Sequence, residues 1–158
     1  MKSKDIPDPI RAPVLALDLG SKRVGVAVSD ALSISSTRLD VIPRTNWKQL
    51  LRDVENLARR FDAQTLVIGL PLKLNGSLGD AALATRQTAL KFARSLKLPV
   101  YLQDERLTSA EAEGNLRAAG VRPEEVGSRV DSEAAALILR DFLASDQERI
   151  LITPQLSE

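Results

Sequence analysis

The segment that most constrains the fold is a short, uninterrupted apolar run in the middle of the chain, Thr65–Leu70 (T-L-V-I-G-L). A strand without a polar face has to be buried on both faces, and such strands occur in parallel sheets that helices cover on both sides. Helical patterns flank the run: residues 47–61, with Thr45 or Asn46 as the cap, precede it, and residues 80–97 follow it. The run therefore predicts an α/β protein with a parallel strand at the centre of its sheet.

Three strands are predicted before the first helix. Val14–Leu19 is an apolar strand that contains one acid, residues 20–23 form a turn, and residues 24–29 form the second strand of a hairpin. In residues 39–43, Leu39 and Val41 alternate with Asp40 and Ile42. This alternation predicts a third strand at an edge of the sheet. Together these segments predict an antiparallel meander of three strands.

After the central strand, the chain alternates helices with one more strand. Residues 99–103 form the fifth strand, and residues 108–111 have the capping-box pattern of a helix that Gly120 ends. The final helix is predicted over residues 131–144, whereas the short apolar run at 150–152 is left unassigned. Few small folds share this order, in which an antiparallel meander is followed by parallel crossovers through helices. It favours an RNase H-like fold with a mixed five-stranded sheet flanked by helices.

The expected RNase H-like domain covers residues 13–145. Residues 1–12, with alternating charges and two prolines, predict a disordered leader, and residues 146–158 form a tail of uncertain structure. The leader has no apolar core, so it is not a signal peptide, and there is no run of about 18 apolar residues that could span a membrane. We therefore expect a cytoplasmic protein without a membrane partner.

The composition excludes several classes of chemistry. The chain has no Cys and no His, so thiol nucleophiles, Ser-His triads, zinc sites, haem ligands and disulfides are excluded. Catalysis would therefore depend on carboxylates, hydroxyls, Lys or Arg. The formal net charge is only +1, so a nucleic-acid partner would have to be bound by a local basic patch.

Three acids stand at the ends of predicted elements: Asp18 in the first strand, Glu105 after the fifth strand and Asp131 at the start of the final helix. Each has an ordinary structural explanation, as a turn residue, a solvated surface charge and a helix N-cap, respectively. The topology could, however, bring all three to one edge of the sheet, where open α/β sheets bind ligands. Clustered carboxylates repel one another unless cations neutralise them, and their hard oxygen atoms suit Mg²⁺ or Mn²⁺. Two such ions can activate a water and stabilise the leaving oxygen in phosphodiester hydrolysis.

Four motifs of the chain resemble, in the right order, those of the YqgF/RuvX family. They are residues 17–27 (L-D-L-G-S-K-R-V-G-V-A), residues 67–72 (V-I-G-L-P-L) with 75–77 (N-G-S), residues 104–108 (D-E-R-L-T) with Ala112 and Glu113, and residues 130–135 (V-D-S-E-A-A). The resemblance covers residues 14–145. It implies an RNase H-like fold related to that of Holliday junction resolvases, and a nuclease role in maturing the precursor of small-subunit ribosomal RNA.

The same resemblance places Asp18, Glu105 and Asp131 on the family's acidic site, which implies that they are the catalytic residues and the metal ligands. The chain departs from the pattern of junction resolvases at the end of the fourth strand. Those enzymes have a Glu near this position, whereas residues 69–71 read G-L-P here, so Glu105 would have to substitute for it.

Six basic residues near the motifs are candidate contacts with the phosphates of a nucleic acid, although each is also explained as a solvated surface charge. They are Lys22, Arg23, Lys73, Arg106, Arg122 and Arg129. Arg23 stands where the family has an Arg, and we expect it to orient Asp18 or a phosphate. Arg129 lies two residues before Asp131, where its planar guanidinium would bind a phosphate.

Residues 121–130 contain Pro123 and Gly127 together with spaced charges, and they predict a mobile loop. Because this segment carries Arg122 and Arg129 next to a candidate metal ligand, we expect it to close over the backbone of the substrate. The alternative is an ordinary exposed connection between two helices.

Together these features favour a metal-dependent nuclease of structured nucleic acid that processes the precursor of 16S rRNA, with Mg²⁺ or Mn²⁺, two ions, as the cofactor. The alternatives are a Holliday junction resolvase acting on branched DNA, a non-catalytic RNA-binding factor of ribosome assembly, and a phosphate-binding ATPase of the actin-like type. Such ATPases carry a similar D-x-G hairpin, but they have two such domains in a much longer chain. The expected partners are RNA, branched DNA and ribosomal precursor particles, and we expect a monomer or a homodimer.

Overall fold

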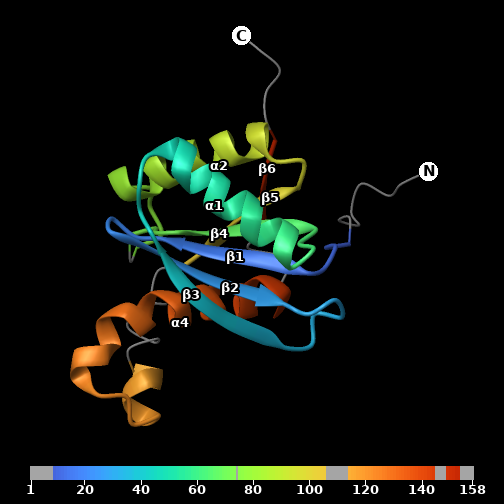
Figure 1. Cartoon of the computed structure of the whole chain (residues 1–158). Coiled ribbons are helices and arrows are strands. Elements are labelled where there is room, and N and C mark those ends of the chain that lie inside the picture. The colour runs from blue at the N-terminus through green and yellow to red at the C-terminus, as the bar shows by residue number, and fades with distance from the viewer. Residues whose placement is uncertain (1–8, 74, 106–113, 145–148, 154–158) are drawn as a thin grey trace.

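One mixed sheet of six strands lies between helices on both of its faces (Figure 1). The structure, a computed structural model, describes residues 9–73, 75–105, 114–144 and 149–153, with the helical backbone alone at 123–129. The strands are β1 (Val14–Leu19), β2 (Arg23–Ser29), β3 (Ser36–Pro43), β4 (Thr65–Leu70), β5 (Val100–Asp104) and β6 (Arg149–Ile152). Their order across the sheet is β3-β2-β1-β4-β5-β6. β4 runs parallel to β1 and β5, and the other three pairs are antiparallel.

Helices cover the two faces of this sheet. α1 (Trp47–Arg60) and α2 (Asp80–Ser95) lie on one face, and α4 (Pro123–Ala144) lies on the other (Figure 1). Residues 114–118 form a further helical segment. Within the described ranges, no helix is both long enough and apolar enough to cross a membrane.

The side chains of the central strands alternate between two cores. Leu15 and Leu17 of β1 pack on the side of α1 and α2, whereas Val14 and Ala16 pack on the side of α4. β4 is buried along its whole length, which confirms the central parallel strand that its apolar sequence predicts. The predicted cap of the first helix is also confirmed, because the side chain of Asn46 accepts a hydrogen bond from the Gln49 amide at 2.9 Å.

The sheet has one strand more than the sequence predicts. Residues 149–152, which had no assignment, form β6 and pair antiparallel with β5. A run of four residues carries too little periodicity to identify a strand, and its conformation depends on the free edge of β5. β3 also begins at Ser36 rather than at residue 39, because pairing with β2 extends to the polar residues that precede the apolar positions.

The prediction of a mobile loop at residues 121–130 is wrong for residues 123–130, which form the first turns of α4. Proline is favoured at the first position of a helix, because the N–H that it lacks would have no partner within the helix there. The two acids that follow Pro123 interact favourably with the positive end of the helix dipole. Gly127 costs a helix only about 1 kcal/mol, which packing can offset. Asp131 consequently lies inside α4 and is not its N-cap.

Other local predictions have mixed outcomes. Gly120 ends the preceding helix as predicted: its φ is +81°, and Val121 N–H donates to the Leu116 carbonyl at 3.0 Å. The capping box at 108–111 lies outside the described residues, as does the leader up to residue 8. Ile10 packs against the core on the side of α4. The division of the chain into leader, domain and tail stays a prediction.

α4 packs directly on the backbone of β2 at Gly25. A Cβ atom added to Gly25 would lie 1.8 Å from the backbone oxygen of Asp131 and 2.2 Å from its carbonyl carbon. A β-bulge between Val24 and Val26 in the pairing with β3 accompanies this contact. The absence of a side chain at Gly25 therefore sets the distance between α4 and the sheet.

We expect the substitution Gly25→Ala to lower the free energy of unfolding by about 1–3 kcal/mol or more, the usual cost of overpacking a core, because α4 must move away from the sheet. Urea unfolding measures the change. Gly114→Ala is the matched control, since a Cβ there meets no atom within 4 Å. A Gly25→Ala variant as stable as the parent chain would contradict the close contact.

Candidate active site at the carboxyl ends of the central strands

The three predicted acids line one cleft of about 650 Å³. Asp18 comes from the end of β1, Glu105 follows β5, and Asp131 projects from α4. The rest of the wall comes from the β1–β2 turn, the segment after β4 and the first turns of α2. The structure thus brings together the three acids that the sequence separates.

Asp18 does not act as a turn residue among the described hydrogen bonds. The β1–β2 turn is closed by backbone, because Gly20 N–H donates to the carbonyl of Asp18 at 3.1 Å and to that of Arg23 at 2.9 Å. The side chain of Asp18 lies on the same face of the sheet as those of Val14 and Ala16, the face that α4 covers, and only 9% of its surface is exposed. Its carboxylate is therefore buried without serving the turn.

The position of Glu105 depends on Gly69 of β4. A Cβ added at Gly69 would lie 2.8 Å from the Cδ and Oε2 atoms of Glu105. The carboxylate of Glu105 thus occupies space that a side chain on β4 would fill. This explains in structural terms how the chain can lack an acid at the end of the fourth strand and still present one beside Asp18.

Asp131 is held by an ion pair. The Nε atom of Arg23, at the start of β2, lies 2.7 Å from Oδ2 of Asp131. The sequence suggested that Arg23 orients Asp18 or a phosphate; the structure shows an ion pair with Asp131, and a contact with phosphate stays a prediction. Both side chains are partly exposed, so solvent reaches the ion pair.

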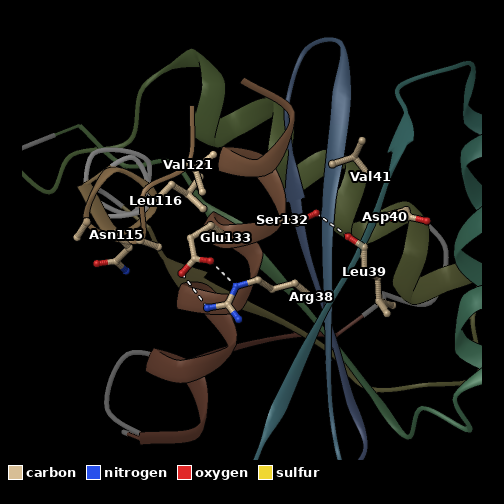
Figure 2. A pocket seen from close by; sticks show the side chains of 11 residues that line it. Arg38, Leu39, Asp40, Val41, Asn115, Leu116, Val121, Ser132 and Glu133 are labelled. Atoms are coloured by element: carbon tan, nitrogen blue, oxygen red, sulfur yellow. Dashed lines mark hydrogen bonds and ion pairs between the residues drawn. The ribbon is translucent and has the colours of Figure 1, made fainter. Parts of the chain in front are cut away.

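The two residues after Asp131 fasten α4 to the edge strand β3 (Figure 2). Ser132 Oγ donates to the carbonyl of Leu39 at 2.7 Å. Arg38 binds Glu133 with two hydrogen bonds, one from Nε to Oε2 and one of 2.9 Å from Nη2 to Oε1. The four residues line a separate pocket of about 1030 Å³. Their contacts attach α4 to β3 directly beside Asp131.

The electrostatics of the cleft disfavour the charged form of Asp18. Burial raises the pKa of the Asp18 carboxyl, a hydrogen bond with Glu105 lowers it, and the charge of Asp131 raises it again, with an upward net effect. Two carboxyl groups can share a hydrogen bond only if one of them carries a proton. A cation at this point would replace that proton.

The donor set partly fits a divalent ion. Asp18 and Glu105 offer adjacent hard oxygen atoms, the ligands that Mg²⁺ and Mn²⁺ prefer. Within the described part of the chain, however, no group of three potential ligands is close enough together to hold an ion as it stands. Asp131 is the remaining candidate, and Arg23 holds it in this arrangement.

The six basic candidates are distributed unevenly. Arg23 is at the site, through its contact with Asp131. Lys22, Lys73 and Arg122 are exposed and are not among the residues that line the cleft. Arg106 lies outside the described residues, and only the backbone of Arg129, within α4, is described.

Two residues of the cleft were missed by the sequence analysis. Arg44, after β3, donates from Nη1 to the Gly20 carbonyl at 3.1 Å, and its N–H donates to the Lys22 carbonyl at 2.9 Å. Thr85 of α2 is buried in the wall of the cleft. No motif marks either residue, because Arg44 reaches the site only through the contact between the end of β3 and the β1–β2 turn.

Comparison with known proteins yields a family and a fold. Residues 12–145 match the family described as "RuvX: Holliday junction resolvase". A protein of Gloeothece citriformis named "Putative pre-16S rRNA nuclease" is 42% identical over 137 residues, which are 87% of this chain and 89% of that protein. One of the same name from Synechococcus sp. is 39% identical over 134 residues, 85% of this chain and 90% of that protein.

The solved structure of T. thermophilus RuvC in complex with a Holliday junction substrate has a TM-score of 0.54 and 17% sequence identity to this chain. The match covers 87% of this chain and 98% of that one. At this identity the likeness concerns the fold alone, and it confirms the predicted RNase H-like architecture.

The ion pair between α4 and β3 predicts a pH-dependent stability. Hydrogen bonding to Arg38 holds the pKa of the buried Glu133 carboxyl below its ordinary value, against the effect of burial. The stabilisation is therefore complete above the pKa of an unfolded Glu, about 4.3, and is lost as the pH falls through the lower folded pKa. The Glu133→Gln variant should be about 1–2 kcal/mol less stable than the parent at pH 7. This loss is smaller than that expected for a fully buried ion pair, because the side chain of Arg38 is half-exposed.

Urea unfolding between pH 7 and pH 3 measures this difference, which should shrink as the pH falls. Arg38→Met is the matched partner variant, and the double variant should lose little more than either single one. A difference that stays constant over the whole pH range would contradict the role of the pair.

Proposed function

The chain belongs to the RuvX family, and from this premise we propose that it is a metal-dependent nuclease that hydrolyses phosphodiester bonds of structured nucleic acid. The observation that carries the proposal is the cleft in which the buried Asp18 lies beside Glu105 and Asp131. An acidic cluster with uncompensated charge is of no use to a fold that only binds nucleic acid, because it repels phosphates. It suits an enzyme that binds cations between its carboxylates and the substrate.

The substrate that we propose is the precursor of 16S rRNA. The relatives named for this activity are 39–42% identical over most of their length, whereas the likeness to RuvC supports only the fold. Branched DNA is the second candidate, because the family description itself is Holliday junction resolvase. We further propose that the protein acts in the cytoplasm on ribosomal precursor particles.

In the proposed mechanism, Asp18 and Glu105 would hold the divalent cation, Mg²⁺ or Mn²⁺, and Asp131 would be the third ligand if it were released from Arg23. A cation bound there would supply an activated water and stabilise the leaving oxygen. Arg44 carries positive charge on the wall of the cleft, and Arg23, once released, would carry positive charge beside Asp131. Both would bind the phosphates that flank the scissile bond. Binding of the cation and exposure of Arg23 to the substrate are thereby coupled through Asp131.

The first test of this function is cleavage by the purified chain with Asp18→Asn as the variant. We expect the parent chain to cut precursor rRNA in Mg²⁺ or Mn²⁺ and to stop in excess chelator, and we expect Asp18→Asn to abolish cutting. The variant should melt at the same temperature as the metal-free parent or higher, because a neutral amide removes repulsion from a buried acidic cluster. Gel assays and thermal melts measure the two effects.

A four-way DNA junction serves as the parallel substrate and separates the two candidates. Cutting of the junction but not of the rRNA precursor would favour the resolvase. Robust cutting in chelator would contradict the metal mechanism, and binding without cutting under every condition would favour the non-catalytic assembly factor. ATP hydrolysis by the parent chain, absent from Asp18→Asn, would favour the ATPase.

The second test concerns Arg44. Arg44→Ala should weaken substrate binding by about 1–3 kcal/mol, the cost of a charge-assisted contact with phosphate, and should reduce the salt dependence of binding by about one unit of slope. Lys73→Ala is the matched control, because Lys73 is exposed outside the cleft. Equal effects of the two substitutions in filter binding would show that Arg44 has no special contact.

A further inference from the structure

A second groove, of about 810 Å³, lies between α2 and β6, beyond β5 on the face that α1 and α2 cover (Figure 1). Its apolar lining includes Leu90 of α2, Leu102 of β5 and Ile152 of β6. None of its lining residues also lines the cleft of the three acids. The groove therefore needs an explanation independent of the proposed nuclease site.

The groove gathers exposed apolar side chains. Leu78 and Leu83 are 47% and 46% exposed, and Ile150 is 49% exposed. All three line this one groove. Scattered exposed leucines are ordinary on a protein surface, but a contiguous group beside a groove marks a place where another chain binds.

β6 adds an open strand edge to this surface. One edge of β6 pairs with β5, and no other described strand pairs with its second edge. The free N–H and C=O groups of such an edge are a template for one more extended strand. The register places Ile150 and Ile152 opposite Leu102 and Val100, so both lie on the face of α2 and border the groove.

The charge of the groove identifies the kind of segment that fits. The charged residues of its lining are Arg86 and Arg94, both exposed on α2. Neither forms an ion pair with any other residue that the structure describes. Two unpaired guanidinium groups next to an apolar floor are complementary to carboxylates that flank an apolar segment.

We propose that this groove is a docking site for an extended segment of a partner protein, apolar in its middle and acidic at its ends, which adds to β6 as a seventh strand. The segment pairs with the free edge of β6, its apolar side chains cover Leu83, Leu90 and Ile150, and its acids bind Arg86 and Arg94. A second copy of this chain fits less well. Antiparallel pairing of two β6 strands would bring two α2 helices together, with arginines facing arginines.

A nucleic acid is also a poorer occupant of this groove. Its lining contains no aromatic side chain among the described residues, so it offers no platform on which bases could stack. Apolar side chains such as Leu83 and Ile150 gain nothing from phosphates. The charge and the apolar surface together favour a peptide.

The experiment uses the full chain labelled with ¹⁵N and a synthetic peptide of four alternating Val and Ile residues with two Glu residues at each end. The apolar part matches the four residues of β6 in length. We expect the peptide to shift the amide resonances of β6 and α2 and to slow hydrogen exchange along β6. A peptide with Lys in place of Glu, and one with Pro in the apolar part, should each bind at least tenfold more weakly.

Charge reversal provides the matched variants. Arg86→Glu combined with Arg94→Glu should weaken binding of the acidic peptide at least tenfold, and should strengthen binding of the Lys peptide. Arg52→Glu combined with Arg59→Glu makes the same change of charge on exposed positions of α1, outside the groove, and should leave both affinities unchanged. Asp18→Asn should also bind the peptide normally, which separates this site from the nuclease site.

Four outcomes would overturn the proposal. They are no shift at millimolar acidic peptide, equal affinity for the Lys peptide, duplex RNA shifting the β6 amides when the peptide does not, and a dimer in sedimentation that Ile150→Lys dissociates. The third would assign the groove to nucleic acid, and the fourth would assign it to a second copy of the chain.

Discussion

The contact between the backbone of α4 and the backbone of β2 at Gly25 is the constraint on which the candidate site depends. With no side chain between them, the carbonyl of Asp131 rests directly on the sheet. Gly25 pairs with Asp18 across the β1–β2 hairpin, so the same position that receives α4 lies beside the buried acid. A bulkier residue would separate Asp131 from Asp18 without altering any residue of the cleft.

A second glycine has a similar role on the other side of Asp18. Gly69 leaves room on β4 for the carboxylate of Glu105, which arrives from the end of β5. The site is therefore assembled from three elements that approach one another where two strands lack side chains. Its geometry depends on backbone packing more than on the lengths of the acids themselves.

The acids of this site are only partly balanced by positive charge. Arg23 neutralises Asp131, and the pair of Asp18 and Glu105 shares a hydrogen bond in place of a cation. The second ion pair of α4, between Arg38 and Glu133, is only two residues away but acts on the edge strand β3. α4 thus carries one acid for the cleft and one for its own attachment to β3.

The sequence alone determined the central strand, the hairpin, a helix cap at Thr45 or Asn46, the Gly120 stop and the candidacy of the three acids, because each depends on neighbours in the chain. Periodicity, turn residues and motif order all lie within short segments. Only the tertiary structure decided that β6 exists, that α4 begins at Pro123, that Arg23 binds Asp131 and that Arg44 reaches the cleft. These features depend on a free strand edge and on contacts between segments far apart in the chain, and no local pattern encodes them.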